Sequence, residues 1–175
     1  MPTCERGSVL RVALPNKGSL AAGASDLVSA AGYSTERSDG QLLVSDVENG
    51  VEFVFVRPGD IAFYVERGAL DFGITGRDML ADSGVEIEEI LALGFGRSDF
   101  YYAVPHGSGL SPEHFAGLRV ATSFVRIVRR DLQQRGVEAQ IVPLSGAVEI
   151  AVRLGIADAV ADVVQTGRTL AMAGL

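Results

Sequence analysis

The stretch Glu149–Leu170, EIAVRLGIADAVADVVQTGRTL, decides how this chain folds. A segment with helical periodicity comes first, and the apolar run Ala159–Val164 that follows has the composition of a strand. The run ends at a turn that contains Gly167, where the backbone is free to turn tightly and approach a ligand. Successive N–H groups in such a turn form an anion-binding nest, so this stretch predicts an α/β protein with a ligand site at a strand end.

The side chains around this turn suit a sugar phosphate. We call Asp162–Thr169 the cup loop. Thr166 and Thr169 supply hydroxyl groups, and the carboxylate of Asp162 is placed to accept hydrogen bonds from two ribose hydroxyls. The simpler alternative is a strand followed by a helix with Thr166 as its N-cap. From the turn alone both interpretations stay open, because short glycine motifs often match by chance.

Strands and helices alternate along the rest of the chain. The predicted strands are Val9–Leu14, Gln41–Val47, Val51–Val56, a short buried one at Asp71–Ile74, Ile87–Leu93, Phe100–Val104, Leu118–Ala121 and Ala139–Val142. The predicted helices are Leu20–Ala31, one that ends near Val65, one after Gly76, Val125–Gln134, and one whose buried face carries Ala147, Ile150, Ala151 and Leu154. Asn49-Gly50 predicts a hairpin. The alternation predicts an α/β fold with mostly parallel sheets.

Turns that carry a cation follow three of the predicted strands. Lys17 lies in Pro15–Gly18, which we call the first loop, Arg57 precedes Pro58-Gly59-Asp60, and Arg77 lies in Gly76–Asp78. Because ligands of parallel sheets bind at the carboxyl ends of strands, we expect these turns to share one site. Taken singly, each has a simpler explanation, namely a solvated lysine or a local Arg–Asp ion pair.

Composition narrows the class of protein. With 175 residues, 47% of them hydrophobic and 21% charged, the chain has material for one domain or two small lobes and is not expected to be disordered. The net charge of −7 disfavours a nucleic-acid-binding protein, although local cations still allow an anionic substrate.

The cellular location and the absence of a metal site are predicted from features that the sequence does not contain. Cys4 cannot form an internal disulfide, and neither a signal peptide nor a membrane span is visible, so we expect a cytoplasmic protein. His106 and His114 have no second ligand at useful spacing, so we expect surface residues and no protein metal site.

The stretch from Glu149 onward resembles the signature of the ATP phosphoribosyltransferases, which catalyse the first step of histidine biosynthesis. The signature positions are Glu149, Gly155, Ala157, Val160, Asp162, Val163, Thr166, Gly167, Thr169 and Leu170. Leu14–Leu20, Val56–Ile61 and Asp71–Asp78 are also similar to the family. The usual first loop is Pro-Lys-Gly-Arg. Here Asn16 is interposed and Ser19 stands where Arg is usual, which leaves Lys17 as the cation of the loop.

The resemblance implies a fold, a reaction and a set of residues. The fold would be a two-lobed cleft of the periplasmic-binding-protein type II kind. Residues 1–94 would form the lobe that binds ATP and pyrophosphate, and residues 95–175 would form the lobe that carries the cup loop. Gly94–Ser98 would be one of the two segments that connect the lobes. The reaction would transfer phosphoribosyl from 5-phosphoribosyl 1-pyrophosphate (PRPP) to N1 of ATP with Mg²⁺. PRPP would contact Glu149, Asp162, Val163, Thr166, Gly167, Arg168 and Thr169. ATP or pyrophosphate would contact Lys17, Gly18, Asp60, Gly76 and Asp78, with Lys17, Arg57 and Arg77 as the catalytic cations.

Several alternatives stay open at this point. Glu149 forms an i, i+4 pair with Arg153 on a predicted helix, which by itself would be an ordinary surface ion pair. Family chains continue past the cup loop to complete the first lobe, and long forms add a histidine-binding domain. We therefore expect this chain, which ends at Leu175, to lack both. The resemblance also implies a dimer or hexamer, with a separate regulatory subunit in short forms. The alternatives are an inactive nucleotide- or PRPP-binding subunit and a two-lobed binding module without chemistry.

Overall fold

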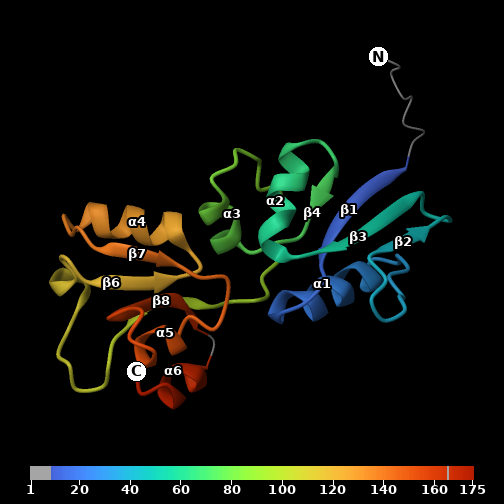
Figure 1. Ribbon diagram of the computed structural model, residues 1–175. Helices are drawn as coiled ribbons and strands as arrows, with labels where there is room; N and C mark the ends of the chain where they lie inside the picture. Colours follow the sequence, from blue (N-terminus) through green and yellow to red (C-terminus); the bar gives the residue numbers. More distant parts are fainter. Residues whose placement is uncertain (1–8, 165) are drawn as a thin grey trace. The chain divides into compact units, whose positions relative to one another are not determined.

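The computed structural model describes residues 9–164 and 166–175, so Cys4 lies outside the described residues. The chain divides between Gly96 and Arg97 into two compact units, each an α/β layer structure with its own sheet (Figure 1). Within the described ranges, no helix is both long enough and apolar enough to span a bilayer.

The first unit has a four-stranded sheet in the order β2-β3-β1-β4. β1 (Leu10–Pro15) lies parallel to β3 (Val51–Val56) and to β4 (Phe72–Gly73), whereas β2 (Leu43–Asp46) pairs antiparallel with β3 through the predicted Asn-Gly hairpin. The helices are α1 (Ser19–Ala30), α2 (Pro58–Glu66) and α3 (Arg77–Ser83).

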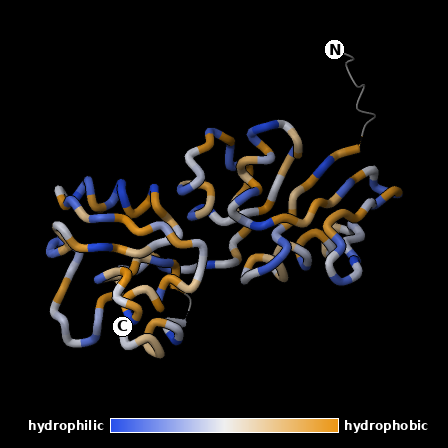
Figure 2. The backbone as a smooth tube through the Cα atoms, in the orientation of Figure 1, coloured by the Kyte–Doolittle hydropathy of each residue, from blue (hydrophilic) through white to orange (hydrophobic). Residues whose placement is uncertain are grey.

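The alternation of side chains along the strands places α1 and α2 on opposite faces of this sheet (Figure 1). Leu14, Phe53 and Phe55 point to one face and pack with Ala24 of α1. Their neighbours Ala13 and Val54 point to the other face, where Ile61 of α2 packs. Both faces are covered, so β1 and β3 are apolar apart from Arg11 and Glu52, and Figure 2 shows these strands as largely hydrophobic.

The second unit repeats this plan with a sheet in the order β5-β8-β6-β7. β6 (Arg119–Thr122), β7 (Gln140–Pro143) and β8 (Ala159–Val164) are parallel, and β5 (Asp99–Ala103) is antiparallel to β8. The helices are α4 (Val125–Gln134), α5 (Ile150–Arg153) and α6 (Arg168–Met172), with a short 3-10 turn at Pro112–His114.

The two faces of the second sheet are covered by different helices. Val128 and Leu132 of α4 pack with Val120 and Ala159 on one face. Ala121 and Val160 point to the other face, where Ala151 of α5 and Leu170 of α6 pack. The expected α/β fold with mostly parallel sheets is therefore confirmed, with one antiparallel edge strand in each sheet.

Three expectations about single elements are wrong. Ile87–Leu93 forms no strand, because no described strand pairs with it, and Ile90 and Leu91 remain 68% and 71% exposed. β4 is a two-residue edge strand and not a buried one, so Phe72 is 44% exposed.

The third correction concerns the helix before the cup loop. α5 has four residues, which is too short to present a face from Ala147 to Leu154. Ile150 and Leu154 are exposed, and Val148 and Ala151 are the buried residues. Gly155, with φ of 69°, follows directly after the C-cap residue Leu154, which limits the helix to one turn.

Arg119 and Asp158 tie the start of β6 to the residue before β8. The carboxylate of Asp158 accepts hydrogen bonds from Arg119 Nε, Nη2 and backbone N at 3.1, 2.8 and 2.9 Å. These bonds, first from the guanidinium and then from the backbone, lower the pKa of Asp158 below its ordinary value of 3.8. A carboxyl whose pKa is lower in the folded chain than in the unfolded chain stabilises the fold above the unfolded pKa. That contribution is lost as pH falls through the folded value.

We therefore predict that Asp158→Asn lowers the melting temperature at pH 7 by roughly 3–8 °C, the loss expected for about one charge-assisted hydrogen bond. The difference from the wild type should shrink as pH falls below 3.8 and through the lowered pKa of Asp158, where its carboxylate becomes protonated. Melting followed by circular dichroism across pH tests this, with the exposed Asp39→Asn as control. A difference that does not change with pH would contradict the assignment.

Gly73 allows α2 to lie directly on β4. A Cβ built at Gly73 would collide with Ile61 Cγ2 and lie 3.2 Å from Ala13 Cβ. We expect Gly73→Ala to lower the free energy of unfolding by about 1–3 kcal/mol, because the packed helix must move away. In the matched control Gly59→Ala the new Cβ meets only Met79 Sδ at 3.8 Å, so urea unfolding should show no loss there. Equal stability of both variants would disprove the contact.

Candidate functional sites in the two units

The turns of the first unit meet at the carboxyl edge of its sheet. The backbone N–H of Asn16 in the first loop donates to the carbonyl of Val56 at 2.9 Å. Thr75 Oγ1 donates to the carbonyl of Pro58 at 2.8 Å, which joins the turn after β4 to the turn after β3. The parallel register of β1, β3 and β4 thus places all three predicted cation turns at one edge.

The first turn of α1 closes this group of turns. The Leu20 side chain lies so near Gly76 that a Cβ there would be 3.6 Å from its Cδ1, and a Cβ at Gly96 would collide with its Cδ2. Gly18 enters α1 at φ of 84° and ψ of −176°, a conformation that favours glycine. The first loop and the turn at Gly76 are therefore neighbours across one leucine.

The three predicted cations have different surroundings. Lys17 and Arg57 are exposed, and neither has an ion pair within the described residues, so the local Arg57–Asp60 pair does not form there. Arg77 does not pair with Asp78 and instead binds Glu89, with Nε 2.8 Å from Oε2. The hydrogen bonds that Arg77 donates to the Glu89 carboxylate lower the pKa of Glu89 and raise the pKa of Arg77.

Asp60 and Asp78 lie in the first turns of α2 and α3. An acidic side chain in that position is stabilised by the helix dipole without any ligand. Asp78 also folds back over Gly76, where its carboxylate occupies the space of a Cβ. The structure therefore gives both aspartates a local role beside the cation turns.

In the second unit the cup loop follows β8. Asp162 Oδ1 accepts the backbone N–H of Val163 at 2.8 Å. Gly167 is the N-cap of α6 with φ of 68°, and no side chain caps this helix, so the alternative with Thr166 as N-cap is wrong. Thr166, Arg168 and Thr169 are exposed, and Gln165, also in the loop, lies outside the described residues.

Glu149 lies at the same edge of the second sheet, after β7. It is the N-cap residue of α5 and half-buried, and no ion pair joins it to Arg153 in the described part of the chain. The backbone N–H of Leu144 donates to the carbonyl of Thr122 at 2.9 Å, which holds the start of this turn against the end of β6.

Two residues at these sheet edges were not predicted from the sequence. Ala147 has φ of 49°, the one non-glycine residue with positive φ among those described, and such backbone strain gathers at functional sites. Arg37, from the loop between α1 and β2, donates from Nη2 to the carbonyl of Asn16 at 3.3 Å. Neither belongs to a motif, so the sequence carried no signal for them.

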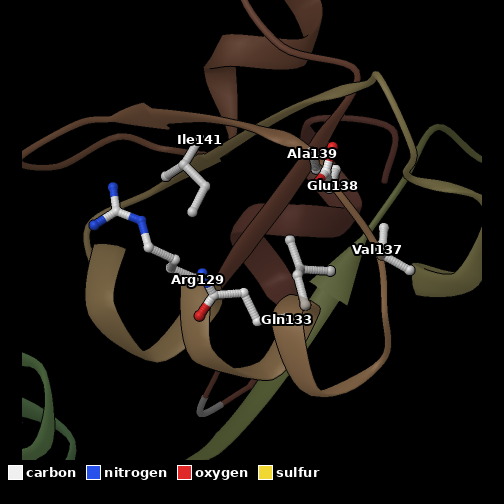
Figure 3. A pocket seen from close by; sticks show the side chains of 7 residues that line it. Arg129, Gln133, Val137, Glu138, Ala139 and Ile141 are labelled. Carbon is white, nitrogen blue, oxygen red and sulfur yellow. The ribbon is translucent and has the colours of Figure 1, made fainter.

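Within the described ranges, the predicted site residues form no metal-ligand cluster, and a hollow in the second unit lies away from them. Among the residues that the structure describes, no three His, Cys, Asp or Glu side chains gather where they could hold a metal ion. A hollow of about 370 Å³ lies between α4 and β7 and is lined by Arg129, Leu132, Gln133, Val137, Glu138, Ala139 and Ile141 (Figure 3). None of the predicted site residues lines it. Its residues Val137–Ala139 precede β7, at the edge of the sheet opposite to the cup loop.

The family model described as ATP phosphoribosyltransferase (HisG) matches residues 57–175. This chain belongs to the ATP phosphoribosyltransferase family. Curated members from Corynebacterium jeikeium and Salinibacter ruber are each 54% identical to it over 95% of its length. The chain spans 59% of the length of these two relatives.

Solved structures support the same family and fold. The ATP phosphoribosyl transferase (HisG:HisZ) complex from Thermotoga maritima matches 95% of this chain and 79% of that chain, with a TM-score of 0.81 and 28% identity. The alkanesulfonate-binding protein SsuA from Xanthomonas axonopodis pv. citri matches 96% of this chain and 58% of that chain, with a TM-score of 0.53. At 19% identity the second likeness concerns the fold alone, and it confirms the expected likeness to type II periplasmic binding proteins.

The bond between Thr75 and Pro58 offers a direct test of how the turns of the first unit are held. Thr75→Val keeps the shape of the side chain but leaves the Pro58 carbonyl without its donor, so we predict a loss of about 1 kcal/mol in the free energy of unfolding. Thr75→Ser retains the hydroxyl and should lose less than half of that. Denaturant titration measures both, and equal losses would show that the hydroxyl is not the coupling group.

Proposed function

We propose that this chain is the part of an ATP phosphoribosyltransferase that binds PRPP and ATP and transfers the phosphoribosyl group to N1 of the adenine. The observation that supports this most is the family signature at the carboxyl end of β8. There Asp162, Gly167 and Thr169 combine a carboxylate, a left-handed glycine turn and a hydroxyl within one loop.

The groups of the cup loop match the parts of PRPP. The 5-phosphate would bind the backbone N–H groups and hydroxyls of Thr166–Thr169, where an anion gains from the nest and the start of α6. Asp162 would accept the ribose hydroxyls. Glu149, Val163 and Arg168 are proposed as further PRPP contacts, since Glu149 and Val163 are signature positions and all three lie at or beside this edge of the sheet.

The turns of the first unit would bind the remaining anionic groups. Lys17 and Arg57 are exposed cations without an ion pair in the described ranges, so they are available to a phosphate. Gly18, at which an added Cβ would meet nothing within 4 Å, would allow a phosphate to approach the backbone, and Gly76, Asp60 and Asp78 are proposed as further contacts. Arg77 would exchange its Glu89 partner for substrate phosphate.

The proposed reaction mainly requires that the two substrates are positioned and that the charge on the leaving pyrophosphate is stabilised. The bond between ribose C1 and pyrophosphate breaks, C1 gains cationic character, and the lone pair of adenine N1 forms the new C1–N1 bond. Pyrophosphate leaves with the bonding electrons, and lysine and arginine side chains would stabilise the charge that develops on it.

Mg²⁺ would enter with the substrate. The described residues offer no three-ligand cluster, and Mg²⁺ in nucleotide enzymes is typically held by substrate phosphates with one or two carboxylates. A cup loop with one carboxylate, Asp162, suits an ion that arrives on PRPP. When bound, it would neutralise charge on the departing pyrophosphate.

A second candidate is a subunit that binds these ligands without turnover. We further propose that the chain works as a homo-oligomer. Because the similar structure from T. maritima is a HisG:HisZ complex, a separate regulatory subunit is a further partner to test.

The decisive experiment incubates the purified chain with ATP, PRPP and Mg²⁺ and follows phosphoribosyl-ATP by absorbance, with pyrophosphatase present. We expect Thr169→Ala to raise the apparent KM for PRPP roughly tenfold with a smaller effect on kcat, because it removes a hydroxyl from the phosphate site. Stabilisation by PRPP without turnover would favour the binding subunit. A chain that neither turns over nor binds PRPP would refute the proposal.

A further inference from the structure

The loop Tyr33–Leu42, between α1 and β2, is ordered by its own polar groups although it has no regular secondary structure. The backbone N–H of Ser34 donates to Asp46 Oδ2 at 2.8 Å. Gln41 accepts from the N–H of Ser38 at its Oε1 and donates through Nε2 to the carbonyl of Leu43, at 3.0 and 2.9 Å. These bonds hold both ends of the loop against the β2–β3 hairpin and fix the position of Arg37.

Arg37 reaches from this loop to the edge of the sheet where the cation turns meet. Its guanidinium carbon lies 4.2 Å from the centroid of the Phe55 ring. Phe55 belongs to β3 and precedes Arg57 by two residues. Nη1 donates to the carbonyl of Gln41 at 3.2 Å, and Nη2 donates to the carbonyl of Asn16 at 3.3 Å. Phe55 is 1% exposed, so the guanidinium covers a ring that belongs to the core.

The first loop depends on few contacts for its shape. Among the described residues its backbone is held by the bond from the Asn16 N–H to the Val56 carbonyl, by the bond from the Ala21 N–H to the Gly18 carbonyl at 3.2 Å, and by the bond from Arg37 to the Asn16 carbonyl. The side-chain oxygen Oδ1 of Asn16 is buried and has no hydrogen-bond partner in the described part of the chain, which is costly for the turn. A loop that buries an unpartnered amide oxygen gains from a contact that holds it from outside.

We propose that Arg37 is a positioning residue for the first loop. Held by Phe55 and Gln41, it fixes the Asn16 carbonyl so that the next residue, Lys17, presents its ammonium group to the phosphates of the anionic substrate. This inference rests on the proposed function and deepens it, because it names the residue that orients the lysine. Arg37 acts through the backbone of Asn16.

An arginine suits this task better than a lysine. The planar guanidinium stacks on an aromatic ring and directs two N–H groups to two different carbonyls at the same time. A lysine ammonium would contact a carbonyl as a point charge and would lose the stacking geometry. Arg37→Lys should therefore restore only part of the function that Arg37→Ala removes.

Calorimetry of the purified chain with Mg²⁺ and ATP, and separately with inorganic pyrophosphate, tests the proposal. We expect Arg37→Ala to weaken binding of one or both roughly tenfold, with Arg37→Lys between Arg37→Ala and the wild type. The matched control is Arg67→Ala, since Arg67 also covers a phenylalanine, with its guanidinium carbon 5.0 Å from the Phe63 centroid, but belongs to no cation turn. Arg67→Ala should bind as the wild type does.

A double-mutant cycle separates positioning from direct contact. If Arg37 acts through Lys17, then Arg37→Ala should change binding by less than about twofold in a Lys17→Ala background. A full tenfold effect in that background would show direct contact and overturn the proposal, as would an Arg37→Ala variant that binds like Arg67→Ala.

Hydrogen exchange provides a readout without any ligand. Arg37→Ala should speed exchange of the Asn16 amide, which donates to the carbonyl of Val56, whereas Arg67→Ala should not. Unchanged exchange in Arg37→Ala would refute the clamp even if the chain binds ATP. Faster exchange in a chain whose wild type binds neither ATP nor pyrophosphate would instead refute the proposed function, and with it the ligand role of Lys17.

Discussion

Parallel pairing of neighbouring strands is the constraint on which the rest of each unit depends. β3, β1 and β4 run in one direction in the first sheet, and β7, β6 and β8 do so in the second. Each parallel connection needs a crossover, and here the crossovers include helices that cover both faces. The carboxyl ends of the strands then meet at one edge, and the turns that leave that edge carry the polar groups.

Those turns are held by a small number of specific bonds. Thr75 joins two turns of the first unit through the Pro58 carbonyl, and Leu144 joins two strand ends of the second through Thr122. A ligand site on such turns needs this support, because short loops without partners would not hold charged groups in place. The clamp proposed for Arg37 belongs to the same set, since it joins the loop before β2 to the first loop.

The periodic and composition-driven features were predictable. The apolar runs located each strand that the structure describes, and the Asn-Gly pair located the antiparallel hairpin. The prediction of a strand at Ile87–Leu93 was wrong for a physical reason, since composition reports a tendency and a strand needs a partner to pair with. The helix face from Ala147 to Leu154 was wrong because spacing alone does not show that the helix ends after one turn at Gly155.

The sequence by itself determined the fold class, the family signature from Glu149 to Leu170 and the order of the cation turns, because these depend on local pattern and on residue identity. Only the tertiary structure decided which groups are neighbours. It paired Arg77 with Glu89 twelve residues on, and it brought Arg37 to Asn16 across 21 residues of sequence. Such contacts depend on where the backbone turns in space, and no local spacing encodes them.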